Sequence, residues 1–384
     1  MIELLGKSKE ELRAFCGELG EPAYRGVQIY HALYAERRFD FARMTNLPAA
    51  LREQLAKEAC ITLPEVKQRF VSADGSVRYL FGLGGAEEKE SNTEDTEKKS
   101  KENTEKNQKK PNRPRTPASV EAVFMPSEGR QTICISTQAG CAVDCHFCLT
   151  SQLGLIRNLT AGEILAQGLV PLEEQQAQLT PQTNVVLMGQ GEPLLNYEPV
   201  MAALRILLDP EGMGISPKHV TLSTSGIVPG IERLARERAR PKLAISLNAS
   251  NDEQRDALMP INKKYPLSAL LEACRNYPLR PWEHLTFEYV MLGEVNDSAE
   301  DAYRAVRLLA PLRRVKVNLI PWNPGELPYR ESSPQRIEEF RRILNEKGVP
   351  AFVRYSRGRD VMAACGQLAL LDTSAPSGLV SIAP

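Results

Sequence analysis

Three cysteines within one short stretch are the residues of this sequence most suited to chemistry. Cys141, Cys145 and Cys148 follow the spacing C-x3-C-x2-C. Thiolates gathered at one point form a soft, anionic site, and such sites select zinc, copper(I) or iron-sulfur clusters. Three thiols at this spacing suit a 4Fe-4S cluster in which one iron stays open for a substrate. Structural zinc usually takes a second pair of Cys or His ligands, and no second pair follows at finger spacing.

Two other interpretations of this stretch stay open at this point. The first is zinc with His146 as a fourth ligand, although His146 lies between two of the cysteines and would strain a shared tetrahedron. The second is a disulfide pair with a spare thiol. The chain has eight cysteines, no signal-peptide pattern and no apolar run long enough to span a bilayer. We therefore expect a cytoplasmic protein, without membrane contact, whose cysteines stay reduced unless chemistry uses them.

Length and composition are those of an ordinary globular protein. The chain has 384 residues, of which 42% are hydrophobic and 25% charged, and this allows one large domain with a smaller one. Lys and Arg together number 48, as do Asp and Glu. The overall charge therefore does not attract nucleic acid, and any such binding must come from local patches.

The first third of the chain predicts helices and then a hairpin. Residues 1–62 read as three helices with interspersed basic and tyrosine residues, which are typical either of solvated helix faces or of a small helical domain that contacts RNA. Asp74-Gly75 lies between two strand-like runs and predicts a β-hairpin within a linking region at 63–126. Residues 87–117 contain no core-forming side chain, so we expect a disordered, charged insertion at 85–118, placed within a sheet.

Short apolar runs alternate with helical patterns through the remaining region, 127–384. Strands are predicted at 133–136, 184–188, 219–223, 242–246, 285–291, 315–320 and 350–354, with helices between them at 160–169, 197–208, 229–238, 266–275, 298–309 and 334–346. Such alternation is typical of a parallel sheet, and about six units predict an α/β fold with an incomplete (β/α)6 barrel.

Polar and glycine-containing loops follow the ends of these predicted strands, where barrel enzymes build their sites. The turn from Gly189 to Pro193 allows close backbone approach to a ligand, and its Glu192 can accept hydrogen bonds from an ammonium group. Small polar groups at the other strand ends can bond a carboxylate, ribose hydroxyls or an adenine. The candidate binding residues are Gly191, Glu192, Ser223, Ser246, Leu247, Asn248 and Asn323.

The cysteine motif is similar to the signature of radical S-adenosylmethionine (SAM) enzymes, in which the open iron binds SAM. Over nearly its whole length the chain also resembles the RlmN family of bacterial RNA methyltransferases. The resemblance implies one 4Fe-4S cluster, SAM, and methylation of C2 of an adenine in 23S rRNA and in tRNA. The stretches that carry it are Glu121-Ala-Val-Phe, Thr132-Ile-Cys-Ile-Ser, Arg157-Asn-Leu-Thr-Ala-Gly-Glu-Ile, Thr221-Leu-Ser-Thr-Ser-Gly, Asn318-Leu-Ile-Pro-Trp-Asn-Pro and Arg357-Gly-Arg-Asp to Ala364-Cys-Gly.

The resemblance also assigns roles to three residues outside the cysteine motif. In the family, a cysteine matching Cys365 is methylated by one SAM, and a second SAM yields a radical that takes hydrogen from this S-methyl group. The carbon radical adds to the adenine, which tethers the RNA to the protein. A cysteine matching Cys134 then attacks the Cys365 sulfur, so that methylated RNA leaves and a disulfide remains. Glu121 matches the proposed general base.

The resemblance leaves several alternatives open. The sibling activity, methylation at adenine C8, would use the same cysteines, and a zinc-binding RNA-interaction protein is the alternative outside enzymes. The family commonly has Ser-Leu-His where this chain has Ser246-Leu247-Asn248, so SAM contact through Asn248 is an open question. Gln190 replaces a common Met, and the insertion is not a family feature. The implied partners are an electron donor such as flavodoxin or ferredoxin and the RNA, and we expect a monomer.

Overall fold

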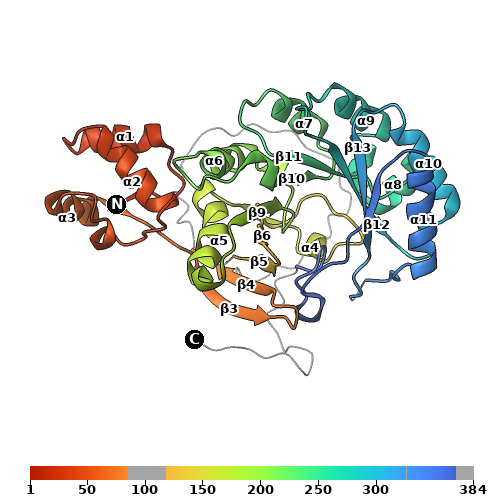
Figure 1. Cartoon of the computed structure of the whole chain (residues 1–384), viewed down its shortest axis with the longest axis horizontal. Helices are drawn as coiled ribbons and strands as arrows, with labels where there is room; N and C mark the ends of the chain where they lie inside the picture. The colour runs from red at the N-terminus through yellow and green to blue at the C-terminus, as the bar shows by residue number, and fades with distance from the viewer. Residues whose placement is uncertain (85–117, 326, 369–384) are drawn as a thin grey trace, which may run out of the picture.

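The structure, a computed structural model, describes residues 1–84, 118–325 and 327–368. Its centre is one ten-stranded sheet with strand order β14-β13-β12-β11-β10-β9-β6-β5-β4-β3 (Figure 1). The predicted incomplete barrel is confirmed, because the strands from β6 to β14 run parallel while β14 and β3 remain as two separate edges. The parallel strands are β6 (Arg130–Cys134), β9 (Gln182–Leu187), β10 (Val220–Thr224), β11 (Lys242–Ser246), β12 (Leu285–Met291), β13 (Val315–Pro321) and β14 (Ala351–Val353).

Helices cover the outer face of the parallel strands (Figure 1). They are α5 (Ala161–Glu174), α6 (Tyr197–Leu208), α7 (Val228–Ala235), α8 (Asp252–Leu258), α9 (Leu267–Asn276), α10 (Ala299–Leu309) and α11 (Pro334–Glu346). Local sequence fixes several of their starts: Thr160 and Ser298 each form a capping box with the residue three positions later, which satisfies backbone N–H groups at the helix start. Short 3-10 turns occur at Phe41–Arg43, Gln176–Gln178, Pro193–Leu195, Pro217–His219, Pro260–Lys263 and Arg359–Val361.

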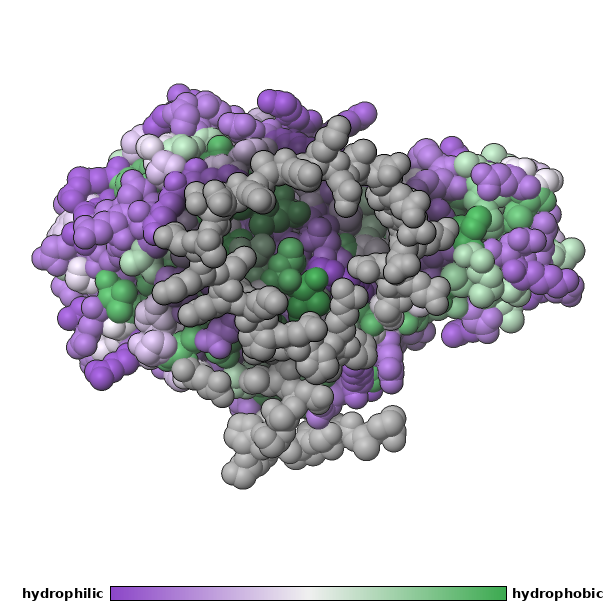
Figure 2. Space-filling model, turned by 180° about the vertical axis from the view of Figure 1, so that it is seen from behind, coloured by the Kyte–Doolittle hydropathy of each residue, from purple (hydrophilic) through white to green (hydrophobic). Residues whose placement is uncertain are grey.

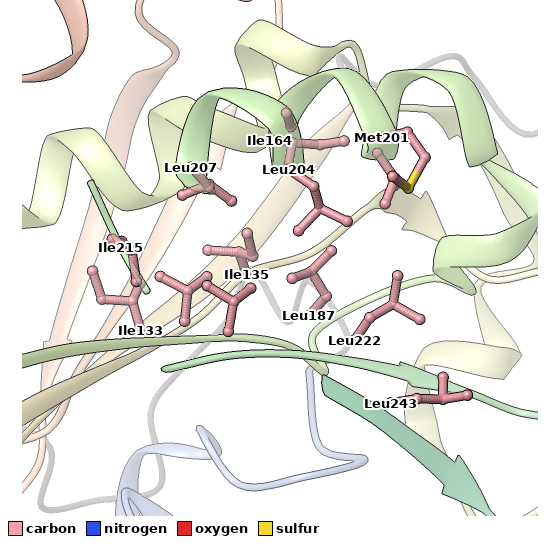
Figure 3. Close-up of a cluster of buried hydrophobic side chains, with 14 of the residues drawn as sticks. Ile133, Ile135, Ile164, Leu187, Met201, Leu204, Leu207, Ile215, Leu222 and Leu243 are labelled. Carbon is pink, nitrogen blue, oxygen red and sulfur yellow. The ribbon is translucent and has the colours of Figure 1, made fainter. Parts of the chain in front are cut away.

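The main core lies between these helices and the sheet. Figure 3 shows Leu187 and Leu222 from the strands facing Leu204 and Met201 from α6, and all four side chains are at most 1% exposed. Each such burial contributes about 1.5–3 kcal/mol relative to an exposed position. The other strand face, with residues such as Ser223 and Ser246, is only half-buried and points into the barrel. The core therefore fixes which strand residues face the interior.

The antiparallel part of the sheet contains the predicted hairpin. Strands β3 (Glu65–Val71) and β4 (Val77–Gly82) pair on either side of the Asp74-Gly75 turn, and β5 (Ser119–Ser127) pairs with both β4 and β6. Gly82 lies directly opposite Ser119, so the chain leaves and re-enters the sheet at paired positions. The residues between, 85–117, carry nearly all of the predicted disordered insertion and lie outside the described residues.

Three helices at the N-terminus form a group beside the barrel (Figure 1). They are α1 (Lys9–Glu18), α2 (Tyr24–Tyr34) and α3 (Ala49–Glu58), accompanied by the short paired strands β1 (Ile2–Glu3) and β2 (Ala59–Cys60). The Tyr30 hydroxyl and the Lys9 ammonium group both reach Asp209, just after α6, at 3.0 and 2.9 Å. Among the described residues, no helix combines the length and apolar character needed to cross a membrane.

The crossing of α1 and α2 generates a stability prediction. A Cβ on Gly26 would lie 2.4 Å from the backbone nitrogen of Arg13, whereas a Cβ on Gly17 of α1 would meet nothing within 4 Å. We expect Gly26→Ala to lower the free energy of unfolding by about 1–3 kcal/mol, because backbone atoms must move apart. Gly17→Ala, the matched control, should raise it by about 0.5–1 kcal/mol. Urea unfolding measures both, and equal effects would contradict this account of the crossing.

Candidate active site

A cavity of about 340 Å³ lies at the carboxyl ends of the parallel strands. Apolar side chains such as Val290, Ile320 and Trp322 form part of its wall. The face shown in Figure 2 is hollowed near its middle, where hydrophobic residues are visible amid a mostly hydrophilic surface. The predicted site residues that line the cavity are Cys134, Cys141, Cys145, Cys148, Gly191, Glu192, Ser223, Ser246, Asn248, Asn323 and Cys365.

The three-cysteine loop connects β7 (Gln138–Gly140) to the short helix α4 (Leu149–Gln152). Strand β7 pairs with β8 (Leu155–Asn158), and neither was predicted from the sequence. Gly140 has φ +72°, and a Cβ there would lie 1.9 Å from the Gly154 carbonyl oxygen, so only glycine fits. The next residue, Cys141, donates its backbone N–H to the same oxygen at 3.0 Å. The β7–β8 pair thus fixes where the first cysteine enters the cavity.

The arrangement of the thiols is compatible with a 4Fe-4S cluster. All three line one cavity, yet among the described residues no group of three His, Cys, Asp or Glu side chains is placed to hold one ion. A 4Fe-4S cluster binds its cysteines at separate iron atoms, so they need not converge as zinc ligands do. His146 is exposed and does not line the cavity. Burial raises the pKa of the Cys141 thiol to about 12, and iron binding must displace this proton.

Glu192 is buried beside the cluster loop at the end of β9. Gly191 has φ +94°, and a Cβ there would lie 2.5 Å from the Gln138 Cβ, so the turn requires glycine. One carboxylate oxygen of Glu192 accepts hydrogen bonds from the Ser225 backbone N–H at 2.7 Å and hydroxyl at 2.8 Å. Burial raises the pKa of Glu192, although these hydrogen bonds work against the rise. The carboxylate is thus held rigidly at the cavity wall.

Arg255, which the sequence did not single out, lies behind the cavity and is fully buried. Its guanidinium group donates to the backbone oxygens of Ser225 at 2.6 Å and Ser246 at 3.0 Å. It also donates to the oxygens of Leu247 at 3.1 Å and Asn262 at 2.9 Å. Burial lowers the pKa of Arg255 to about 10, which leaves it charged at neutral pH. Arg255 therefore connects the loops that follow β10 and β11.

Leu247 and Asn248 differ in their relation to the cavity. The Leu247 side chain is buried in the main core and does not line the cavity, so only its backbone lies at the strand end. Asn248 lines the cavity with φ +55°, a conformation that Asn tolerates. Its side-chain oxygen accepts the Val290 N–H at 2.8 Å, and its nitrogen lies 3.3 Å from the Met259 sulfur. The Asn248 amide oxygen therefore joins the loop after β11 to strand β12.

Cys134 and Cys365 line the same cavity although they are far apart in the sequence. Cys134 ends β6 within an apolar cluster, whereas Cys365 is exposed in the loop after β14. Burial raises the pKa of Cys134 far above its usual value, and the neighbouring Cys365 charge raises it further. Asn323 donates from Nδ2 to the Cys365 carbonyl oxygen at 3.2 Å and to the Ser356 hydroxyl at 2.9 Å. Asn323 therefore fixes the backbone of the Cys365 loop.

Glu121 does not line the cavity in this conformation. It is fully buried on β5, where Arg78 of β4 donates to one carboxylate oxygen and Gln190 donates to the other at 3.4 Å. The Arg78 guanidinium also lies 3.9 Å from the centre of the Phe70 ring. The predicted general base therefore has a cationic partner, and its carboxylate would have to leave Arg78 to reach a substrate.

Another buried carboxylate, Glu288 of β12, does line the cavity and was missed by the sequence analysis. One of its oxygens accepts from Asn318 Nδ2 at 2.9 Å, and the Asn318 oxygen in turn accepts from Arg354 at 3.3 Å. Burial raises the pKa of Glu288 to about 7. The sequence did carry a signal for Glu288, because a charged residue interrupts the mostly apolar run Thr286 to Met291. Side chains alternate along a strand, and this position faces the barrel interior.

Comparison with known proteins agrees with this geometry. The family model "Radical SAM superfamily" matches residues 135–306, and "Ribosomal RNA large subunit methyltransferase N-terminal domain" matches residues 2–61. A probable dual-specificity RNA methyltransferase RlmN of Koribacter versatilis is 46% identical, over 91% of this chain and 96% of the relative. The RlmN of Anaeromyxobacter sp. is 44% identical, over 94% and 88%. A radical SAM methyltransferase structure from Sphaerobacter thermophilus is 39% identical with a TM-score of 0.82, covering 96% and 99%.

The barrel, the cysteine loop and these matches define a radical SAM enzyme that uses one 4Fe-4S cluster and SAM. More narrowly, the chain belongs to the RlmN family of methyltransferases. The earlier zinc and disulfide interpretations are thereby set aside for Cys141, Cys145 and Cys148. Cys141 and its two companions would hold the cluster, and the Glu192 loop would border the SAM bound at it.

The ligand assignment generates a direct measurement. Anaerobically purified protein should contain about four irons and four sulfides per chain. Cys145→Ala should lose most of this iron, because the cluster then keeps only two of its three thiolate ligands. Cys274→Ala, which removes a buried cysteine of α9 outside the cavity, is the control and should keep the iron. Metal analysis and an absorbance spectrum provide the readout, and stoichiometric zinc without iron would overturn the assignment.

Proposed function

We propose that this protein methylates C2 of an adenine in 23S rRNA and in tRNA, with Cys365 as the carrier of the methyl group. The observation that carries the proposal is that Cys365, Cys134 and the three motif cysteines line one cavity. Adenine C2 is an electron-poor carbon that cannot attack a sulfonium, so a polar methyl transfer is not feasible. When bound, the cluster and SAM supply the one-electron chemistry that a methyl group on Cys365 requires.

Cys365 acts first as a nucleophile, for which the thiolate is the competent form. The protein atoms around the Cys365 sulfur desolvate its thiolate and raise its pKa to about 11, so the thiol must lose a proton before methylation. Its exposed position lets the methylated side chain meet both SAM and a base that enters from solvent. Asn323 orients the loop through the Cys365 carbonyl. The residue is thus placed to carry carbon between two substrates.

Cys134 resolves the covalent intermediate. Its thiolate attacks the Cys365 sulfur, and the bond from that sulfur to the methylene carbon on adenine C2 breaks. This carbon takes up a proton to become the methyl group, and a Cys134–Cys365 disulfide forms as the RNA leaves. Both thiols line the same cavity, and the Cys365 charge raises the pKa of Cys134, which supports this pairing. Glu121 is assigned to removal of the C2 proton, and this role requires its release from Arg78.

The remaining roles are assigned to neighbouring residues. Glu192, Ser223, Ser246 and Asn248 border SAM, and Asn323 serves both SAM and the Cys365 loop. Arg354 lines the cavity and supplies a cation for an RNA phosphate. The helical group 1–62 contacts RNA, and a flavodoxin or ferredoxin supplies electrons to a cytoplasmic monomer.

The site chemistry is tested by an assay on the isolated RNA. Anaerobic protein with SAM, a reductant and unmodified 23S rRNA should yield 2-methyladenosine, separated by chromatography from 8-methyladenosine. Substrate tRNA should give the same nucleoside. Exclusive 8-methyladenosine would replace the C2 assignment by the sibling activity, and no methylated adenosine from cluster-loaded protein would contradict the proposal.

The two cysteines can be separated by trapping. Cys134→Ala should accumulate an RNA-protein crosslink, because the covalent adduct forms but cannot be resolved. Cys365→Ala should form no crosslink, since the methyl carrier is absent. Denaturing gels with labelled RNA measure the adduct, and Cys274→Ala serves as the matched control. A Cys134→Ala enzyme that is fully active and not crosslinked would exclude the resolving role.

A further inference from the structure

The loop that carries Cys365 spans the open side of the barrel. We name residues 354–368 the Cys365 strap. The strap begins after β14, one edge of the sheet, where the Arg354 N–H donates to the Leu319 oxygen at 2.8 Å. It then reaches the turn between β3 and β4 at the other edge. In Figure 1 the blue loop lies beside the turn of the orange hairpin. The strap therefore connects the two edges that the incomplete barrel leaves apart.

Two aspartates make the contact between the strap and the hairpin. Asp360 of the strap accepts the Ser72 hydroxyl at 2.6 Å and the Ala73 backbone N–H at 3.0 Å. In the opposite direction, Asp74 of the turn accepts the Gly358 N–H at 3.0 Å and lies 3.6 Å from the Arg357 guanidinium. Burial would raise the pKa of Asp74, but the surrounding hydrogen bonds outweigh it and lower the pKa to about 2.

Apolar packing and further hydrogen bonds continue this contact toward Cys365. Val361, Ala363 and Leu368 of the strap form one buried cluster with hairpin and strand side chains that include Cys134. Beyond Cys365, the Gly366 oxygen accepts the Leu149 N–H of α4 at 2.8 Å. The methyl-carrying cysteine is thus held between the hairpin turn on one side and the cluster loop on the other.

We propose that Asp74 and Asp360 are positioning residues for Cys365, which they hold in the cavity it shares with Cys134 by fixing the strap to the β3–β4 turn. This inference rests on the proposed function for its catalytic meaning. The contacts between the strap and the hairpin are observed whether or not that function holds. A fixed strap raises the effective concentration of one thiol at the other, whereas a released strap lets Cys365 sample solvent. The hairpin then contributes to the reaction although none of its residues 65–82 lines the cavity.

The proposal is tested on cluster-loaded protein by the Cys134–Cys365 thiol-disulfide equilibrium against glutathione, read by peptide mapping under anaerobic conditions. Asp360→Ala removes both hydrogen bonds that the Asp360 carboxylate accepts from the turn, and Ser72→Ala removes one of these two. We expect the disulfide equilibrium constant to fall about tenfold for Asp360→Ala, and less for Ser72→Ala, because preorganisation is lost. Glu331→Gln is the matched control, since Glu331 pairs with Arg359 of the same strap at 3.2 Å on the exposed side.

A second readout is the number of methylated adenines formed per 5'-deoxyadenosine. Asp360→Ala should lower this ratio, because the radical is generated while Cys365 is misplaced, and Glu331→Gln should leave it unchanged. The proposal would be overturned if the disulfide equilibrium constant and the methylation ratio of Asp360→Ala both stayed within about twofold of wild type. Equal changes in Glu331→Gln would overturn it as well. If wild-type protein methylates no adenine, the proposed function fails while the thiol equilibrium still decides the role of the strap.

Discussion

The site depends on one buried cation, Arg255. Its guanidinium group donates to backbone oxygens at the ends of two parallel strands, where such buried groups need donors. A hydrogen bond from a charged donor contributes about 1.5–3 kcal/mol, so several together offset the cost of burying the charge. Ser225, held in this way, positions Glu192 in turn. The wall of the cavity is therefore a connected network rather than a set of independent loops.

The barrel imposes the second constraint, because it is open. Parallel strands bring their carboxyl ends to one edge, and this places the cysteine loop, the Glu192 turn and Asn323 around one cavity. An open sheet also leaves two edges with unpaired backbone groups. Here the chain that crosses between those edges is the chain that carries Cys365. Closure of the fold and placement of the Cys365 thiol thus use the same residues.

The carboxylates around the cavity differ in what they can do. Glu192 is fully engaged by Ser225 and the Leu194 N–H, and Glu121 is paired with Arg78 outside the cavity. Glu288 faces the cavity with a pKa raised by burial to about 7, and its carboxylate accepts a hydrogen bond from the neutral Asn318 amide. Similar side chains therefore have separate roles because their burial and hydrogen-bond partners differ.

The sequence by itself determined the parallel barrel, the hairpin, the helical N-terminus and the three-cysteine motif. Hydrophobic periodicity, the Asp74-Gly75 turn and cysteine spacing are local signals, which can be recognised in the sequence alone. Only the tertiary structure decided that Leu247 points into the core, that Arg78 holds Glu121 away from the cavity, and that Arg255, Glu288 and Asp360 support the site. Each of these depends on contacts between residues far apart in the chain, such as Ser72 and Asp360, and no periodicity or spacing encodes such a contact.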